Sequence, residues 1–244
     1  MLQPRIIPCL LVKNGGLVKT VQFAAPKYVG DPLNAVRIFN EKEVDELTVL
    51  DIDATAEGRE PNYALIRDLA VECRMPLCYG GGVTTAEQVQ KIIALGVEKV
   101  AVSAAAVADP TFLPRACERV GSRHEVFTHN GRRATGLDPA EFAARIERLG
   151  AGEIVVNSID RDGVMKGYDL ELMERVRAAV TLPLTALGGA GSLKDVGELI
   201  RRFGIVGAAA GSLFVFKGVY RAVLINYPNR ADKNALIAHA REAA

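Results

Sequence analysis

The chain carries a long internal repeat, and this repeat limits the folds that it can adopt. Residues 47–53 form an apolar run that closes on two aspartates spaced two residues apart, and residues 155–162 close in the same way. The stretches that follow also correspond in pairs, 75–82 with 182–189 and 99–103 with 206–212. A repeat of this length predicts two similar half-structures, whose strands each end in an acidic or glycine-rich loop.

Short, continuously apolar strands alternate with amphipathic helices along the whole chain. This pattern is typical of a parallel sheet that helices cover on its outside. A Rossmann-type sheet is disfavoured, because no GxGxxG motif follows the first strand. We therefore expect one domain, 1–244, folded as a (β/α)8 TIM barrel with half-barrels at approximately 1–120 and 121–244. The expected strands are 6–12, 47–52, 76–79, 99–103, 153–158, 183–187 and 205–210.

The loops and helices between these strands have recognisable starts. Residues 13–20 are expected to form a loop. Asp31, Asp109 and Asp138 each precede a proline, and this pair favours a helix start at 31, 109 and 138. Thr84 or Thr85 is expected to cap a further helix. Other helices are expected over 63–69, 169–180 and 192–202 and near the C-terminus.

Composition excludes several classes of function. The formal net charge of the 244 residues is +1, so no nucleic-acid-binding arm or membrane-surface patch is expected. No apolar run approaches the roughly 20 residues that span a bilayer, and no signal-peptide pattern precedes the first strand. Four cysteines without a CxxC pair fit core-filling thiols in a reducing cytoplasm, and three scattered histidines predict no metal site.

Glycines follow several of the expected strands in both halves. Glycine lets backbone N–H groups approach a phosphate closely, and the N-terminus of the next helix favours an anion. The alternative is that these glycines only make tight turns, but their repetition in both halves favours phosphate binding. Two such sites on opposite sides of a barrel would suit a substrate with a phosphate at each end. The first site would use Gly81, Gly82 and Ser103, and the second Gly188, Gly189, Gly211 and Ser212.

Acidic and basic side chains lie at the same ends of the strands. Asp51 and Asp162 are candidates for acid–base catalysis or for holding a polar substrate. Acids at strand ends can instead cap the next helix, and this alternative stays open for both. Lys19, in the loop after the first strand, is the third catalytic candidate. No cofactor is indicated.

Charges of alternating sign mark the opposite ends of four strands. Arg5, Glu46, Lys99 and Glu153 each lie just before a strand or at its first residue. In a barrel these side chains would converge on the N-terminal face, where charged residues usually serve stability. A ring of paired charges across that mouth could also act as a gate.

The chain resembles the cyclase subunit family of imidazole glycerol phosphate synthase over nearly its whole length. The motifs that carry the resemblance are 5–10, 30–32, 45–47, 50–52, 80–82, 152–154, 158–163 and 188–191. The resemblance implies that a glutaminase subunit docks on the N-terminal face and that its ammonia passes a charged gate at Arg5, Glu46, Lys99 and Glu153. It also implies a phosphate contact at Gly163. In the family the ammonia then closes the imidazole ring of a bis-phosphorylated ribulosyl aminoimidazole carboxamide nucleotide.

The chain departs from the family pattern at two catalytic positions. Leu11 occupies the place of a family aspartate at the end of the first strand. Leucine can neither transfer a proton nor orient a polar intermediate. The second family aspartate belongs at the end of a fifth strand, but residues 121–123 run directly into 124–128, which resemble the hairpin after that strand. The fifth strand and part of its loop are therefore expected to be missing from this sequence.

Loss of the first acid, with the ammonia route retained, points to a variant of the family. Residues 17–21, 26–32 and 39–44 resemble a variant encoded in bacterial surface-polysaccharide clusters, which is thought to supply ammonia for an amidino group on an acetamido sugar. Such a variant implies a heterodimer with a glutaminase and a separate sugar amidotransferase. Two alternatives stay open: the cyclase of histidine biosynthesis, and a non-catalytic ammonia conduit that activates the glutaminase.

Overall fold

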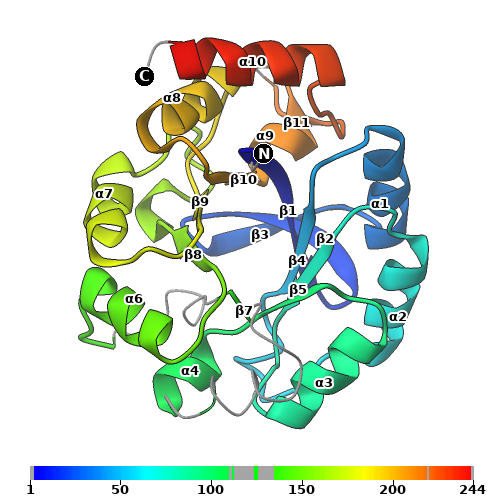
Figure 1. Cartoon of the computed structure of the whole chain (residues 1–244). Helices are drawn as coiled ribbons and strands as arrows, with labels where there is room; N and C mark the ends of the chain where they lie inside the picture. Colours follow the sequence, from blue (N-terminus) through cyan, green and yellow to red (C-terminus); the bar gives the residue numbers. More distant parts are fainter. Residues whose placement is uncertain (1–2, 110–111, 113–123, 126–134, 219, 243–244) are drawn as a thin grey trace.

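A computed structural model describes residues 3–109, 112, 124–125, 135–218 and 220–242, and shows a strongly curved parallel sheet inside a ring of helices (Figure 1). Eight strands are hydrogen-bonded in the order β7-β6-β5-β4-β1-β10-β9-β8. This order, with helices on the outside, is that of a (β/α)8 barrel and confirms the expected fold class. The strands are β1 Arg5–Lys13, β4 Leu47–Asp51, β5 Leu77–Gly80, β6 Lys99–Ala101, β7 His124–Glu125, β8 Ile154–Asn157, β9 Leu184–Leu187 and β10 Gly207–Ala210.

The strand next to β6 is very short. His124 and Glu125 form β7 and pair in parallel with Val100 and Ala101 of β6. Two residues of the segment expected to follow the missing fifth strand thus take that strand's place in the sheet. Residues 113–123 and 126–134, on which the expected gap falls, lie outside the described residues. β7 and β8 form the two ends of the hydrogen-bonded path.

The helices begin where the sequence predicts them. Asp31 caps α1 by accepting from the Asn34 amide at 2.9 Å, and Asp138 caps α6 by accepting from the Ala140 amide at 2.9 Å. Thr85 begins α3 with a capping box. The helix expected from 109 falls mainly outside the described residues, while a short helix, α4, precedes it. The helices are α1 Pro32–Glu41, α2 Tyr63–Glu72, α3 Ala86–Ala94, α4 Ala104–Ala108, α6 Pro139–Arg148, α7 Leu170–Ala179, α8 Leu193–Phe203, α9 Ser212–Val215 and α10 Arg230–Glu242.

The expected loop after β1 is instead part of a β-hairpin, and this expectation was wrong. β2 (Gly16–Val21) pairs antiparallel with the end of β1, placing Val18 opposite Leu11, and β3 (Ala24–Gly30) pairs with β2. The apolar residues Leu17 and Val18 are buried by this pairing. A second small hairpin joins β11 (Phe216–Lys217) to β12 (Ala222–Val223).

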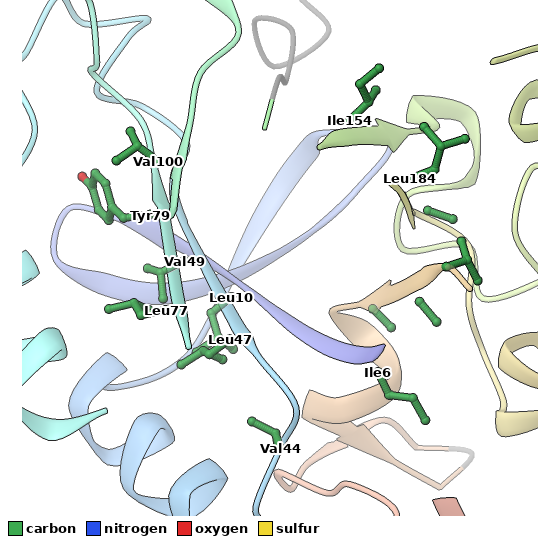
Figure 2. Packing of buried hydrophobic residues seen from close by; sticks show 14 of the residues in the cluster. Ile6, Leu10, Val44, Leu47, Val49, Leu77, Tyr79, Val100, Ile154 and Leu184 are labelled. Carbon is green, nitrogen blue, oxygen red and sulfur yellow. The ribbon is translucent and has the colours of Figure 1, made fainter. Parts of the chain in front are cut away.

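Buried residues form two layers, because successive side chains of a strand point to opposite faces. The outer layer lies between strands and helices and includes Ile6, Leu10 and Leu47 (Figure 2). The inner layer fills the barrel and contains Ile7, Cys9, Leu11, Val18, Val155, Leu187 and Ala209. Among the described residues, no helix is both long and apolar enough to cross a membrane.

Candidate functional site

A cavity of about 820 Å³ lies at the carboxyl ends of the strands. The strands of a parallel barrel all end on this face, so residues far apart in the sequence meet there. The cavity brings together every predicted catalytic and phosphate-binding residue except Gly82. These are Lys19, Asp51, Asp162, Gly81, Ser103, Gly163, Gly188, Gly189, Gly211 and Ser212. Gly82 does not line the cavity, and its amide donates to the Thr55 hydroxyl at 3.1 Å.

Lys19 projects from the β2–β3 hairpin into a buried part of the cavity wall. Its side chain lies against Gly211, where a Cβ atom would come within 1.8 Å of the lysine Nζ. Burial lowers the pKa of Lys19, and the nearby Asp162 carboxylate opposes that change. A lysine that loses its proton more readily than usual can act as a base or a nucleophile.

Asp162 connects the β2–β3 hairpin to the loop after β8. Its carboxylate Oδ2 accepts from the Thr20 hydroxyl at 2.7 Å and from the Phe23 amide at 3.3 Å. The next residue, Gly163, has a φ of +68° and passes so close to Thr20 that a Cβ would lie 2.3 Å from the Thr20 carbonyl oxygen. Asp162 thus has a structural role as well as a place in the cavity wall.

Asp51 caps the turn that follows β4. Its Oδ1 accepts from the backbone amides of Asp53 and Ala54 at 3.3 and 3.1 Å, and its Oδ2 lies 3.5 Å from the Arg59 guanidinium. Asp51 therefore caps a turn and not the next helix, α2, whose N-cap is Asn62. Its oxygens have acceptor capacity left, so the carboxylate can still face a ligand.

The predicted phosphate glycines are also required by close backbone packing. Gly81 and Gly188 both have positive φ, and a Cβ would lie 2.3 Å from the Asp51 carbonyl oxygen and 2.7 Å from the Ser158 carbonyl oxygen respectively. The turn interpretation of these glycines therefore has direct support. Ser103 adds a different observation: its buried hydroxyl has no hydrogen-bond partner among the described residues, and it does not cap α4. An unpartnered buried hydroxyl on a cavity wall is suited to a polar ligand.

The middle of the cavity floor is apolar. Leu11 is 9% exposed and packs in the inner cluster with Leu187, Leu50 and Ile52. A carboxylate at position 11 would lose hydration among these side chains, at a high cost in free energy. The site therefore has an apolar side chain at the position where the family resemblance places an acid.

Sequence reasoning missed two features of the cavity, the Asn157 side chain and an ion pair. Asn157 ends β8 on the cavity wall, and within the part of the chain that the structure describes its buried Oδ1 has no hydrogen-bond partner. The sequence did hold a signal for Asn157, which is its position at the end of an apolar strand. Lys13 and Asp53 form an ion pair at 2.6 Å across the same wall. Among the described residues, no group of three or more His, Cys, Asp or Glu side chains could hold a metal ion.

The four predicted gate residues meet at the other mouth of the barrel and form one ion-pair network, called here the charged ring. Arg5 pairs with Glu46 and Glu153 through separate guanidinium nitrogens. Lys99 Nζ lies 2.9 Å from Glu46 and 2.8 Å from Glu153. Each carboxylate thus contacts both cations.

The ring holds Glu153 in the ionised form despite its burial. Burial would raise the pKa of Glu153, but the charges of Arg5 and Lys99 outweigh this effect and bring the pKa to about 2. Desolvation offsets much of the attraction within a buried ion-pair network, so its presence is weak evidence for a purely stabilising role. A specific role for the ring is therefore worth testing.

Comparison with known proteins decides the family. Residues 5–221 match the family described as "Histidine biosynthesis protein". The chain belongs to this family. Within it, the chain is HisF-like: a provisionally named imidazole glycerol phosphate synthase subunit HisF of Leptospira interrogans is 55% identical over 252 residues, 97% of this chain and 99% of the relative.

Two further relatives of the HisF-like chain differ in how they are named. A provisionally named subunit, hisF2, of Pseudomonas aeruginosa is 52% identical and covers 94% of this chain and 97% of its own length. The imidazole glycerol phosphate synthase subunit HisF of Hyphomonas neptunium is 42% identical and covers 88% of this chain and 91% of its own length.

Proposed function

We propose that this HisF-like chain is the ammonia-receiving synthase subunit of a glutamine amidotransferase. The observation that carries the proposal is the placement of two features on one barrel: the charged ring at the N-terminal mouth and the cavity at the opposite end. A glutaminase subunit docked over the ring would release ammonia beside Lys99, and the barrel interior would lead it to the cavity.

The cavity would hold a phosphorylated small molecule. Gly81 and Ser103 lie at the ends of β5 and β6, and Gly188, Gly189, Gly211 and Ser212 lie at the ends of β9 and β10. The two groups are separated by β4 and β1 in the sheet order, so they face the cavity from different sides. This arrangement supports a ligand with two anionic ends, with Gly163 adding a backbone contact to one of them.

Leu11 favours a variant that supplies ammonia for amidino-sugar formation in surface-polysaccharide biosynthesis. Ring closure needs groups that move protons at the substrate, and here the floor position is a buried leucine. The carboxylates of Asp51 and Asp162 remain, but both also hold backbone amides in place. In this function a separate sugar amidotransferase would carry out the final transfer, and the chain would mainly receive and direct ammonia.

The cyclase of histidine biosynthesis is the second candidate. It is favoured by the family description over residues 5–221 and by the 42% identical HisF subunit of Hyphomonas neptunium. In that function Lys19, Asp51 and Asp162 would be the groups nearest the reacting atoms. A chain that only conducts ammonia and activates its glutaminase is the limiting form of the first candidate.

All these candidate functions require that the chain bind a glutaminase and receive its ammonia. Stimulation of a glutaminase tests this shared requirement. The glutaminase encoded beside this chain is assayed for glutamate formation from glutamine, alone and with the purified chain. We expect binding and a clear rise in glutamate formation with the chain present. If the two proteins neither associate nor change the rate of glutamate formation, the proposed function is wrong.

A further inference from the structure

A threonine and a glycine on neighbouring strands lie directly above the charged ring. Gly207 of β10 is in register with Arg5 of β1 on one side and with Thr185 of β9 on the other. A Cβ atom at position 207 would come within 1.9 Å of the Thr185 hydroxyl oxygen and 2.8 Å of its Cβ. Gly207 therefore provides the space that the Thr185 side chain occupies.

The Thr185 hydroxyl reaches into the ring. It donates to Glu153 Oε1 at 2.5 Å, and its oxygen lies 3.5 Å from the donating Arg5 Nη2. Thr185 is only 2% exposed, so its hydroxyl has little access to water. A hydrogen bond from a buried hydroxyl to a carboxylate is stronger than one between neutral groups.

The two oxygens of Glu153 are held by different groups. Oε1 contacts Arg5 and accepts from Thr185, while Oε2 contacts Lys99 at 2.8 Å. If Lys99 moves off Oε2, the contacts on Oε1 still hold the carboxylate against the barrel wall. Thr185 thus helps to fix the carboxylate that Lys99 contacts.

We propose that Thr185 is a positioning residue of the charged ring: it fixes Glu153 through its hydroxyl, in space that Gly207 leaves free. The inference deepens the proposed function and rests on it for the meaning of the ring as an ammonia gate. The charged groups can stabilise a passing ammonia molecule only while they are held in place. A mobile carboxylate would move across the barrel opening or bind water there.

The test compares Thr185→Val with Thr185→Ser. Valine keeps the shape of threonine and removes the hydroxyl, whereas serine keeps the hydroxyl. Thr48→Val is the matched control, since Thr48 is a buried threonine on β4 that makes no side-chain hydrogen bond to the charged ring within the described residues. Hydrogen exchange of the Lys99 ammonium is followed by NMR on 15N-lysine-labelled full-length chain, and Tm is recorded for each variant.

We expect Thr185→Val to speed the exchange of the Lys99 ammonium by roughly tenfold, as the loss of one hydrogen bond to a charged group predicts. Thr185→Ser and Thr48→Val should exchange at nearly the wild-type rate. Gly207→Ala should reproduce the effect of Thr185→Val, because its methyl group displaces the hydroxyl. Equal exchange in Thr185→Val and wild type, or equal acceleration in Thr48→Val, overturns the proposal.

The glutaminase assay keeps the two proposals separate. If wild-type chain fails to bind and stimulate the glutaminase, the proposed function fails, whatever the ring variants show. If wild-type chain stimulates it and the Lys99 exchange does not respond to Thr185→Val, the positioning role of Thr185 fails alone.

Discussion

The ammonium group of Lys19 lies beside the Cα of Gly211, within 1.8 Å of where a side chain at 211 would begin. Gly211 has an ordinary φ of −103°, which any residue can adopt. Glycine is needed here because it leaves room for Lys19, and not for its backbone freedom. The residue expected to bind phosphate thus also decides whether Lys19 can enter its buried position. Phosphate binding at Gly211 and catalysis by Lys19, the two predicted functions of this part of the cavity, both depend on the contact between these two residues.

Gly211→Ala should expel Lys19 without unfolding the protein, because the nearest clash is with the end of a flexible side chain. Wild-type Lys19 is 6% exposed and should resist an acylating reagent, whereas in the variant it should be modified at a rate typical of surface lysines. Peptide mass spectrometry after a timed reaction measures this directly. The exposed Lys194 serves as the internal standard in both samples. Continued protection of Lys19 in the variant would contradict the contact.

The charged ring should make the free energy of unfolding depend on pH in the acidic range. The pKa of Glu153 is about 2 in the folded chain, well below its ordinary value of 4.5, so the unfolded chain binds the proton first as pH falls. The contribution is therefore complete above pH 4.5 and is lost as pH falls towards 2. It amounts to on the order of 3 kcal/mol.

Glu153→Gln removes this titration. The variant should be less stable than wild type at neutral pH, because Arg5 and Lys99 lose a buried partner. Its free energy of unfolding should also change less between about pH 5 and pH 3. Urea unfolding at several pH values gives both quantities, and parallel curves for the two proteins would show that Glu153 does not titrate as described.

Leu11→Asp should destabilise the chain without creating ring-closing activity. The new carboxylate would sit among Leu50, Ile52 and Leu187, and we expect a loss of about 3 kcal/mol from burying an unpaired charge. Activity should stay absent because the resemblance also leaves the second catalytic acid unmatched. Leu11→Asn is the uncharged control, and ring closure by Leu11→Asp above the wild-type level would refute this account of the floor.

Lys99→Ala should uncouple glutamine hydrolysis from the use of ammonia. The substitution leaves Glu46 and Glu153 facing each other across the mouth with Arg5 as the remaining cation of the ring. The measurement is the ratio of glutamate formed to nitrogen transferred in the reconstituted complex, with Lys194→Ala as a surface control. A ratio unchanged from wild type would mean that the ring serves stability only.

The alternation of strands and helices was readable because the strands are mostly apolar and several helices start at a capping residue such as Asp31 or Asp138. The placement of acids and glycines at one end of the barrel followed from that alternation. The hairpin after β1 was not predicted, because Lys13, Asn14 and Gly15 look like a loop and the pairing of Leu11 with Val18 depends on tertiary context.

Other parts of the site could not be read from the sequence. Asp51 and Asp162 were recognised as strand-end acids, but the amides that they hold come from local geometry that spacing does not encode. Thr185 gave no signal, because a lone threonine in a strand normally only favours β structure. Its role is visible only in the structure, where the Thr185 side chain fits into the space beside Gly207 and its hydroxyl donates to Glu153.

The central claim is that this HisF-like barrel receives ammonia but no longer closes the imidazole ring. It is tested by mixing the purified chain and its glutaminase with glutamine and the bis-phosphorylated ribulosyl aminoimidazole carboxamide nucleotide, and by following glutamate and imidazole glycerol phosphate together. A parallel reaction with ammonium salt in place of glutamine removes the dependence on the partner. We predict stimulated glutamate formation with negligible imidazole product in both reactions. Rapid formation of imidazole glycerol phosphate in either reaction would contradict the claim and assign the chain to histidine biosynthesis.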